Sequence, residues 1–343
     1  MRFTIKDVAR KAGVSPATVS RVVGNYGYAS QESRKKVMAA IRELDYRPNA
    51  IARSLVKKTT GVIGMVVTDI QNPFFACLVR GVEQAIWQKG YALFLANTDE
   101  DVSREQAILT ILEEKQVDGV ILVPASSEKT RHLCNFADLG IPFVLLDRSA
   151  RGINVDTVLV DNENGAYQAV SHLIGLSHRR IGVIIDNLDI TTNIERMAGY
   201  RRALIEARLP VEEDLIRSCQ FTEQSAFEIC ARMFKTDKPP TALFTANNFM
   251  TIGALRAIHV VGLRVPEDIA IVGFDDLESS QICWPSLTVV AQPTHAMGIM
   301  AAERLLARIS KQPSPPMETR MQTEFIIRQS CGYAMGLPKK ANG

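Results

Sequence analysis

The sequence predicts an α-helical helix-turn-helix headpiece followed by an α/β core of two doubly wound subdomains. Two short helical patterns separated by a glycine lie near the N-terminus, and basic residues are concentrated in the same region. From Gly61 onward, apolar runs of strand length alternate with helical patterns. Such alternation is typical of parallel sheets covered by helices on both faces.

Length and composition limit the protein classes that the chain can belong to. Its 343 residues, 46% of them hydrophobic, suffice for two or three domains with a large core. No apolar run is long enough to span a bilayer. The segment Met1–Asp7 lacks the apolar stretch of a signal peptide, which predicts a cytoplasmic protein. The cysteines and histidines form no metal-binding pattern, so we expect no metal and no cofactor.

The charges are unevenly distributed along the chain. The net charge is +3, yet the first 60 residues hold 13 of the 40 Lys and Arg residues and 4 of the 37 Asp and Glu residues. A basic segment in front of an acidic remainder is the electrostatic pattern of a nucleic-acid-binding module joined to a soluble domain.

The headpiece begins with two short helical patterns. The first covers 5–12 and ends at Gly13, because glycine readily adopts the left-handed conformation of a helix C-terminus. Ser15 and Pro16 favour the start of a second helix over 16–23. Two short helices joined by a glycine turn form a helix-turn-helix, whose second helix enters the major groove of DNA.

Two further helical patterns follow. Ser30 is placed to cap a third helix over 31–44, which completes a small three-helix core. A break at 46–49 precedes a short helical pattern over 50–56. A helix this short is unstable alone in water, so we expect it to fold only on its target.

Four motifs in this region carry a resemblance to a known family: Thr4–Ala9, Gly13–Ser15, Thr18–Val22 and Arg47–Leu55. Together they closely resemble the lactose-repressor (LacI/GalR) family of bacterial transcriptional regulators. The match is dense and far more specific than a helix-turn-helix pattern alone. It implies a homodimer that reads a pseudo-palindromic DNA operator.

The resemblance also implies roles for individual residues. Pro16, Ala17 and Arg21 face base edges, and arginine suits guanine O6 and N7. Residues 49–57 form a hinge helix in which Leu55 wedges into the minor groove. Gly24 replaces an asparagine found in many members, and Asn25 is the expected substitute. The DNA-binding residues expected are Thr4, Ser15, Pro16, Ala17, Thr18, Ser20, Arg21, Asn25, Tyr28, Asn49, Ala52, Arg53 and Leu55.

The core resembles the periplasmic-binding-protein-like fold that this family shares. Nine apolar runs are too many for one open sheet, which favours two subdomains. The resemblance implies chain crossings near 162, 291 and 322. The domains expected are a DNA-binding domain at 1–47, a hinge and linker at 48–60, and an effector-binding core at 61–343, with an N-subdomain of about 61–161 and 292–322 and a C-subdomain of about 162–291 and 323–335. The predicted strands are 62–67, 92–96, 119–123, 143–146, 158–160, 181–185, 242–245, 269–274 and 287–290.

Polar and aromatic side chains at the expected strand ends predict a ligand site. Open α/β sheets bind ligands at the carboxyl ends of their strands. Carboxylates, amides and guanidinium groups hydrogen-bond sugar hydroxyls, and aromatic rings stack on sugar C–H faces. The resemblance supports Arg196, Asn247 and Asp275 most strongly. The effector-binding residues expected are Asp69, Asn72, Phe74, Phe75, Asp147, Arg148, Thr192, Arg196, Phe221, Asn247, Asp275 and Gln292.

Departures from the family pattern bear on the effector. Relatives that bind purines carry arginine at the position of Ile190, and Asn248 stands where aspartate is common. A neutral hexose or pentose is the first expectation. Arg148 leaves a sugar acid or a sugar phosphate open, and a purine or other metabolite corepressor is the alternative.

Two other classes of protein fit the sequence less well. A transport-type sugar receptor needs a signal peptide and no headpiece. An enzyme is disfavoured because the chain has no P-loop, no G-x-S-x-G and no G-x-G-x-x-G motif, so we expect no catalytic residues. The tail after 330 has no heptads, which argues against a tetramer formed by a C-terminal coiled coil. Whether the effector is an inducer or a corepressor stays open.

Overall fold

A computed structural model of the chain describes residues 3–24, 27–46, 59–312 and 314–333. The predictions for Asn25, Asn49, Ala52, Arg53 and Leu55 therefore lie outside the described residues. The chain splits into two compact units, Met1–Gly61 with Gln116–Asp118 and the remainder. Within the described ranges, no helix is both long and apolar enough to cross a membrane.

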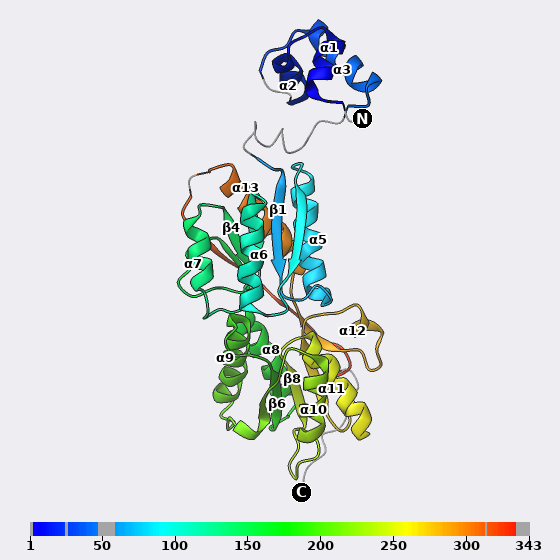
Figure 1. Ribbon diagram of the computed structural model, residues 1–343. Helices are drawn as coiled ribbons and strands as arrows, with labels where there is room; N and C mark the ends of the chain where they lie inside the picture. The colour runs from blue at the N-terminus through cyan, green and yellow to red at the C-terminus, as the bar shows by residue number, and fades with distance from the viewer. Residues whose placement is uncertain (1–2, 25–26, 47–58, 313, 334–343) are drawn as a thin grey trace. The chain divides into compact units, whose positions relative to one another are not determined.

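The first unit is built from three helices, α1 (Ile5–Ala12), α2 (Pro16–Gly24) and α3 (Gln31–Glu43) (Figure 1). At the start of α1, the backbone N–H and the hydroxyl of Thr4 donate to the Asp7 carboxylate at 2.9 and 2.7 Å. Gly13 ends α1 with a left-handed φ of 66°. The buried side chains that hold the three helices together are Val8, Ala9, Ala12, Val19, Val22, Val37 and Ala40.

The second unit contains two six-stranded sheets. All neighbouring strands of the first sheet are parallel. Its order is β11-β5-β4-β3-β1-β2, from β1 (Val62–Val67), β2 (Ala92–Asn97), β3 (Gly119–Leu122), β4 (Phe143–Leu146), β5 (Thr157–Val160) and β11 (Glu318–Met321).

The second sheet is parallel except for one edge strand, β12, which runs antiparallel to β10. Its order is β12-β10-β9-β8-β6-β7, from β6 (Ile181–Ile185), β7 (Ile216–Ser218), β8 (Ala242–Thr245), β9 (Ala270–Phe274), β10 (Thr288–Ala291) and β12 (Glu324–Ile326). Sheet membership shows that the chain passes between the sheets after β5, after β10 and after β11.

Helices cover both faces of each sheet (Figure 1). On the first sheet, the paired helices α5 and α13 bury a cluster with Ile63, Leu78 and Leu305. On the second sheet, α8 packs with α9 and α10 packs with α11. The helices are α5 (Pro73–Trp87), α6 (Val102–Glu114), α7 (Arg131–Asp138), α8 (Asn162–Gly175), α9 (Thr191–Glu206), α10 (Glu223–Met233), α11 (Asn248–Val261), α12 (Ser279–Ile282) and α13 (Thr294–Ile309), with a 3₁₀ turn at Glu213–Leu215.

Helices α5 and α13 approach each other through glycines. A Cβ atom added to Gly81 would lie 2.2 Å from the backbone carbonyl oxygen of His295, and one added to Gly298 would lie 2.3 Å from that of Leu78. No side chain fits in either space without separating the helices. The contact therefore depends on both glycines.

The substitution Gly81→Ala is expected to lower the free energy of unfolding by about 1–3 kcal/mol, the usual cost of overpacking a tight contact. Thermal or urea unfolding followed by circular dichroism measures this loss. Gly175→Ala is the matched control, because Gly175 is also helical and a Cβ there meets no atom within 4 Å. Equal stability of the two variants would contradict the close helix contact.

Candidate functional site

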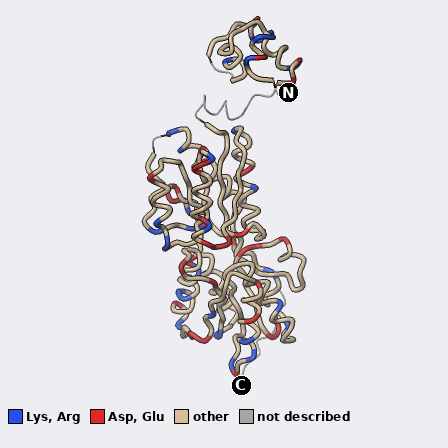
Figure 2. The backbone as a smooth tube through the Cα atoms, viewed as in Figure 1, with Lys and Arg blue, Asp and Glu red and all other residues tan. Residues whose placement is uncertain are grey.

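The second helix of the headpiece exposes the side chains expected to meet DNA. Pro16, Ala17 and Arg21 are exposed on α2, while Thr18 and Ser20 are half-buried. Within the described residues, no hydrogen bond or ion pair engages the Arg21 guanidinium. Figure 2 marks the lysines and arginines of this unit. The Arg21 guanidinium on this helix is therefore available to a ligand.

Two neighbouring features of the headpiece are also compatible with the expected contact with DNA. The Ser15 hydroxyl accepts from the backbone N–H of Thr18 at 3.1 Å, which orders the first turn of α2. Tyr28 leaves 87% of its surface exposed, unusual for an aromatic side chain in a unit with so small a core.

A cavity lies between the two sheets of the second unit, where the strands of both end. Its empty volume, which includes space open to solvent, is about 340 Å³. Helix and loop residues that follow strands of both sheets reach it. The lining residues are Asn72, Phe74, Phe75, Asp147, Arg148, Asp186, Thr192, Asn193, Arg196, Phe221, Asn247, Asp275 and Gln292.

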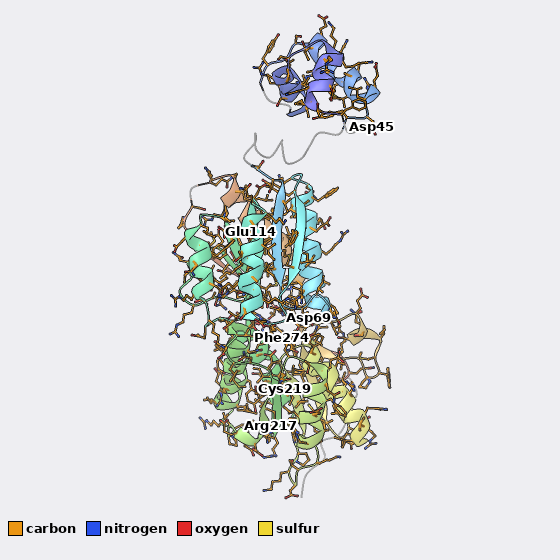
Figure 3. All side chains as sticks on the ribbon, in the orientation of Figure 1. Asp45, Asp69, Glu114, Arg217, Cys219 and Phe274 are labelled. Carbon is orange, nitrogen blue, oxygen red and sulfur yellow. The ribbon has the colours of Figure 1, made fainter. Side chains whose placement is uncertain are left out.

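The structure brings together every predicted effector residue except Asp69. Asp69 does not line this cavity: although it follows β1 (Figure 3), its carboxylate accepts from the Gln71 N–H at 2.9 Å in a local turn. Sequence reasoning missed Asp186 and Asn193. Asp186 directly follows β6, so the strand-end pattern that selected Asp147 and Asp275 also contained the signal for Asp186.

Two of the cavity's aspartates occupy left-handed turns. Asp147 directly follows β4 and Asp275 directly follows β9, with φ values of 67° and 78°. Aspartate adopts this region more readily than bulkier side chains do. Strained backbone of this kind is concentrated at binding sites, where the surrounding structure holds it.

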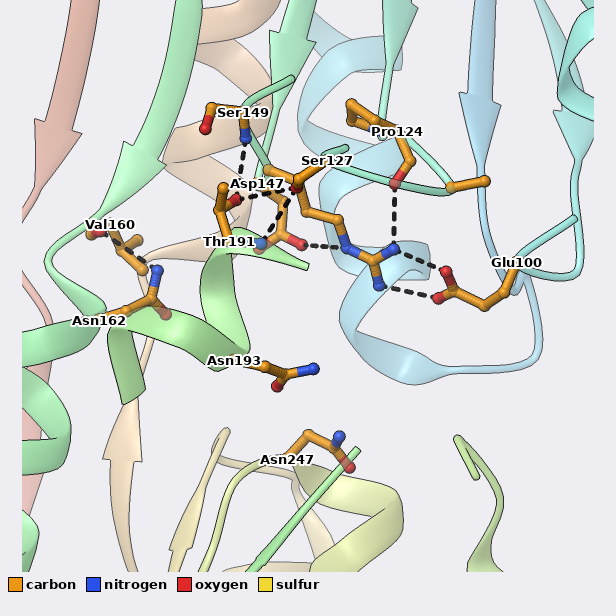
Figure 4. Close-up of polar contacts among 12 residues, drawn as sticks. Glu100, Pro124, Ser127, Asp147, Ser149, Val160, Asn162, Thr191, Asn193 and Asn247 are labelled. Carbon is orange, nitrogen blue, oxygen red and sulfur yellow. Dashed lines mark hydrogen bonds and ion pairs between the residues drawn. The ribbon is translucent and has the colours of Figure 1, made fainter. Parts of the chain in front are cut away.

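Arg148 is buried, and protein acceptors engage both of its terminal nitrogens, while its Nε has no hydrogen-bond partner among the described residues. Its guanidinium donates to both carboxylate oxygens of Glu100 at 2.7 and 2.8 Å and to the carbonyl oxygen of Pro124 at 3.1 Å (Figure 4). Asp147 lies 3.6 Å from the same group. Two carboxylates thus neutralise this cation, and it has little charge left for an anionic ligand.

Arg196 is equally buried, and it organises the second lobe around the cavity. It donates to the side-chain oxygen of Asn162 at 2.9 Å and to the carbonyl oxygen of Ala246 at 2.6 Å. Its guanidinium carbon lies 3.8 Å from the ring centroid of Phe274. Burial lowers the pKa of Arg196, and Asp275 opposes that shift most strongly. The cavity wall therefore depends on this one side chain.

Three carboxyl groups face the cavity, and burial raises the pKa of each. The pKa of Asp147 rises to about 6 and that of Asp186 to about 7, and the pKa of Asp275 rises as well. One carboxylate oxygen of Asp147, one of Asp186 and the amide oxygen of Gln292 are buried with no hydrogen-bond partner among the described residues. The cavity lining thus contains three unpaired acceptor oxygens together with one unpaired donor, the Nε–H of Arg148.

Direct hydrogen bonds join the two lobes beside the cavity. The amides of Asn72 and Asn248 exchange two bonds, at 3.2 and 2.6 Å. Elsewhere along the cleft, the Thr191 hydroxyl accepts from the Ser149 N–H at 3.1 Å, and the Thr191 N–H donates to the Ser127 hydroxyl at 3.0 Å (Figure 4). Asparagine at 248 supplies both a donor and an acceptor, which an aspartate does not.

The raised pKa of Asp186 predicts a pH dependence of stability. A carboxyl group whose pKa is about 7 when folded and near 3.8 otherwise binds its proton more tightly in the folded state. Its contribution to stability is therefore complete below about pH 4. That contribution is lost as the pH rises through about 7, with a slope of up to about 1.4 kcal/mol per pH unit.

The difference in unfolding free energy between the parent protein and Asp186→Asn, measured from pH 4.5 to 8, is expected to follow this slope. Asp189→Asn is the control, because Asp189 is an exposed carboxylate in the same loop. If the free energies of unfolding of the parent protein and of Asp186→Asn change with pH in parallel, the raised pKa of Asp186 is refuted.

Comparison with known proteins finds a matching family for each of the two regions of the chain, the headpiece and the core. Residues 4–49 match the family described as bacterial regulatory proteins, lacI family, and residues 60–329 match periplasmic binding proteins and sugar binding domain of LacI family. The chain is 39% identical to the HTH-type transcriptional repressor PurR of Aliivibrio salmonicida over 95% of this chain and 98% of the relative.

Solved structures give the same result. A lac repressor dimer bound to operator and the anti-inducer ONPF superposes with a TM-score of 0.85 at 27% identity, covering 96% of this chain and 99% of that one. A LacI family transcriptional regulator from Enterococcus faecium with bound ribose gives a TM-score of 0.71 at 29% identity, covering 78% of this chain and 98% of that one. The predicted fold class, of a helix-turn-helix headpiece and a two-lobed α/β core, is thus confirmed.

Proposed function

The chain belongs to the LacI family of bacterial regulatory proteins, and from this premise we propose that a neutral sugar in the cleft controls its affinity for operator DNA. It is a DNA-binding transcriptional repressor that binds operators as a dimer and responds to a small-molecule effector. We assign it to the control of a carbohydrate-utilisation operon in the cytoplasm. The relatives are transcriptional repressors, and we assign this chain no catalytic role.

The unpaired acceptors of the cavity carry the proposal for a sugar. Asp147, Asp186 and Gln292 each present a buried oxygen without a donor. A buried acceptor left unpaired costs about 1–3 kcal/mol, and a ligand that supplies donors recovers that cost. The hydroxyl groups of a monosaccharide are such donors, and Phe74, Phe75 and Phe221 supply apolar walls for its C–H faces.

The charge of the cavity favours a neutral ligand over a sugar acid or a sugar phosphate. Arg148 is neutralised by Glu100 and Asp147, and Arg196 is engaged by protein acceptors. Asp186 and Asp275 add further carboxyl groups to the lining. An anionic ligand would therefore meet carboxylates without a free cation to offset them.

A purine corepressor is the second candidate, because relatives at 35–39% identity are repressors named PurR. The position at which purine-binding relatives carry arginine is Ile190 here. Its side chain is buried ahead of α9 and does not line the cavity. Without a polar group at this position, a purine loses a specific contact, which favours the sugar.

A thermal-shift screen of the full chain tests the effector class. Ribose or glucose at 100 times its dissociation constant is expected to stabilise the protein by about 2.7 kcal/mol, because ligand binding to the folded state alone shifts unfolding. Gluconate and ribose 5-phosphate are expected to cause no shift. A rise in melting temperature with hypoxanthine or guanine and none with any sugar would replace the sugar by a purine.

A further inference from the structure

One carboxylate, that of Asp118, binds the backbone of the segment through which the chain enters the core. The Thr60 N–H donates to one oxygen of this carboxylate at 2.8 Å, and the Gly61 N–H donates to the other at 2.7 Å. The Thr60 hydroxyl lies 3.0 Å from the carbonyl oxygen of Gln116 and 3.2 Å from the Asp118 carboxylate. We call Thr60, Gly61, Gln116 and Asp118 the linker clamp.

Two residues of the linker clamp have a left-handed backbone. The φ values of Gly61 and Gln116 are 71° and 54°. Glycine adopts this conformation readily, whereas for glutamine it is uncommon and costs free energy. The hydrogen bond from the Thr60 hydroxyl to the Gln116 carbonyl oxygen helps to hold this conformation. The linker clamp is therefore a specific structure, held from both of the segments that form it.

The linker clamp directly precedes two neighbouring strands. Gly61 comes immediately before β1, and Asp118 comes immediately before β3. The two strands are parallel, with Ile63 opposite Gly119, and nearly all of their residues are buried. The linker is thus fixed by hydrogen bonds to a second strand connection as well as by the covalent chain to β1.

We propose that Asp118 is a positioning residue for operator binding, because its carboxylate orders the linker at Thr60 and Gly61 before DNA is bound. Asp118 acts through the linker backbone and reads no base. This role concerns the free energy of DNA binding, and it holds whichever ligand occupies the cleft between the lobes.

The physical basis of this role is conformational entropy. Fixing the backbone of a residue in one conformation costs free energy. The linker clamp fixes Thr60 and Gly61 when the protein folds, so this cost does not fall on DNA binding. A repressor dimer has two linkers, so the release of both clamps would weaken its affinity for the operator twice over.

Simple electrostatics predicts the opposite result for the loss of this carboxylate. DNA phosphates repel negative charge, so removing Asp118 would strengthen DNA binding if its charge were its only contribution. The loss of an ordered linker would weaken DNA binding. The sign of the change therefore separates the two explanations.

Fluorescence anisotropy of the full-length dimer on its selected operator, without effector, measures the effect of Asp118→Ala. We expect binding at least about 10-fold weaker than that of the parent protein. Glu114→Gln is the matched control, because Glu114 is an exposed carboxylate at the end of α6 (Figure 3) with no hydrogen bond or ion pair in the described part of the chain. It is expected to bind the operator as tightly as the parent protein or slightly more tightly.

Three further measurements separate a positioning role from a general loss of structure. Base preference, and the slope of operator affinity against salt concentration, are expected to match those of the parent protein, because no contact with DNA is removed. Amide hydrogen exchange at Thr60 and Gly61 is expected to be slow in the parent protein and fast in Asp118→Ala. Sedimentation velocity verifies that each variant remains a dimer.

Thr60→Val tests the linker clamp without any change of charge. It removes the hydroxyl, keeps the backbone N–H that Asp118 accepts, and is expected to weaken operator binding by about 3-fold, as for the loss of one hydrogen bond. Added to Asp118→Ala, it is expected to cause little further loss, because both changes release the same segment.

Operator binding by Asp118→Ala that equals or exceeds that of the parent protein would overturn the proposal. A weakened variant with an altered base preference or a smaller salt slope would also overturn it, because Asp118 would then act through the DNA contacts of the headpiece. If Asp118→Ala fails to fold or to form a dimer, Thr60→Val decides alone, and an unchanged operator affinity in that variant contradicts the proposal.

Discussion

Replacement of Arg196 by methionine is expected to lower effector affinity by at least about 100-fold, because the buried wall of the cavity depends on its guanidinium. Methionine retains much of the side-chain volume and removes the charge and the donors. The oxygens of Asn162 and Ala246 then lose their donor. Asp275 also loses the cation that most strongly offsets its burial, and Asp147 loses the weaker of two such cations, because Arg148 remains.

The same change is expected to lower the free energy of unfolding by about 3–5 kcal/mol, the usual cost of removing one partner from a buried charged network. Arg202→Met is the control on the same helix. Arg202 also stacks on an aromatic ring, that of Tyr167, but it is half-exposed, so its ion pair with Glu163 contributes at most about 1 kcal/mol.

Effector titration and thermal unfolding of both variants separate the two effects. Operator binding without effector reports whether the headpiece of Arg196→Met still functions. If Arg196→Met binds the effector as the parent protein does, the assignment of this cavity as the effector site fails.

Replacement of Arg21 by alanine is expected to weaken binding to the cognate operator by about 1–3 kcal/mol and to relax base preference at one position of each half-site. Arg21 is exposed on α2, and the protein leaves its guanidinium unengaged within the described residues. Pro16 and Ala17 beside it are small and lack side-chain donors, so we expect Arg21 to be the main hydrogen-bonding reader on this helix.

Selection of operators from a random DNA pool measures this preference for the parent protein and the variant. Arg10→Ala is the control, because Arg10 is an exposed cation on α1 that pairs with Asp7 at 3.6 Å. The Arg10→Ala change removes only a general attraction to phosphates, which weakens binding to all DNA sequences alike. A base preference that is identical in Arg21→Ala and the parent protein would exclude the base-reading role.

Much of the fold could be predicted from the sequence because the central strands are continuous apolar runs. The bounds of β4, β6 and β8 agree with the predicted runs. The strands that were missed, β7, β11 and β12, are short edge strands, and charged residues such as Arg217 and Glu318 lie within them. Edge strands need little apolar surface, so their pattern resembles that of a loop.

The candidate site was predictable where a polar residue directly follows an apolar strand. Asp147, Asn247 and Asp275, selected by this pattern, line the cavity, whereas Asp69, whose carboxylate accepts a hydrogen bond in a local turn, does not. The ion pair that neutralises Arg148 joins it to Glu100, 48 residues away along the chain. Such a contact depends on tertiary structure, so the sequence alone does not show that Arg148 is paired with a carboxylate.

Operator affinity measured with and without saturating effector tests the central claim most directly. Fluorescence anisotropy of the full-length dimer on its selected operator gives both dissociation constants, with the sugar that raises the melting temperature as the effector. We predict a change of at least about 5-fold, which corresponds to a coupling free energy of about 1 kcal/mol or more. Equal operator affinities with and without the bound effector would contradict the account.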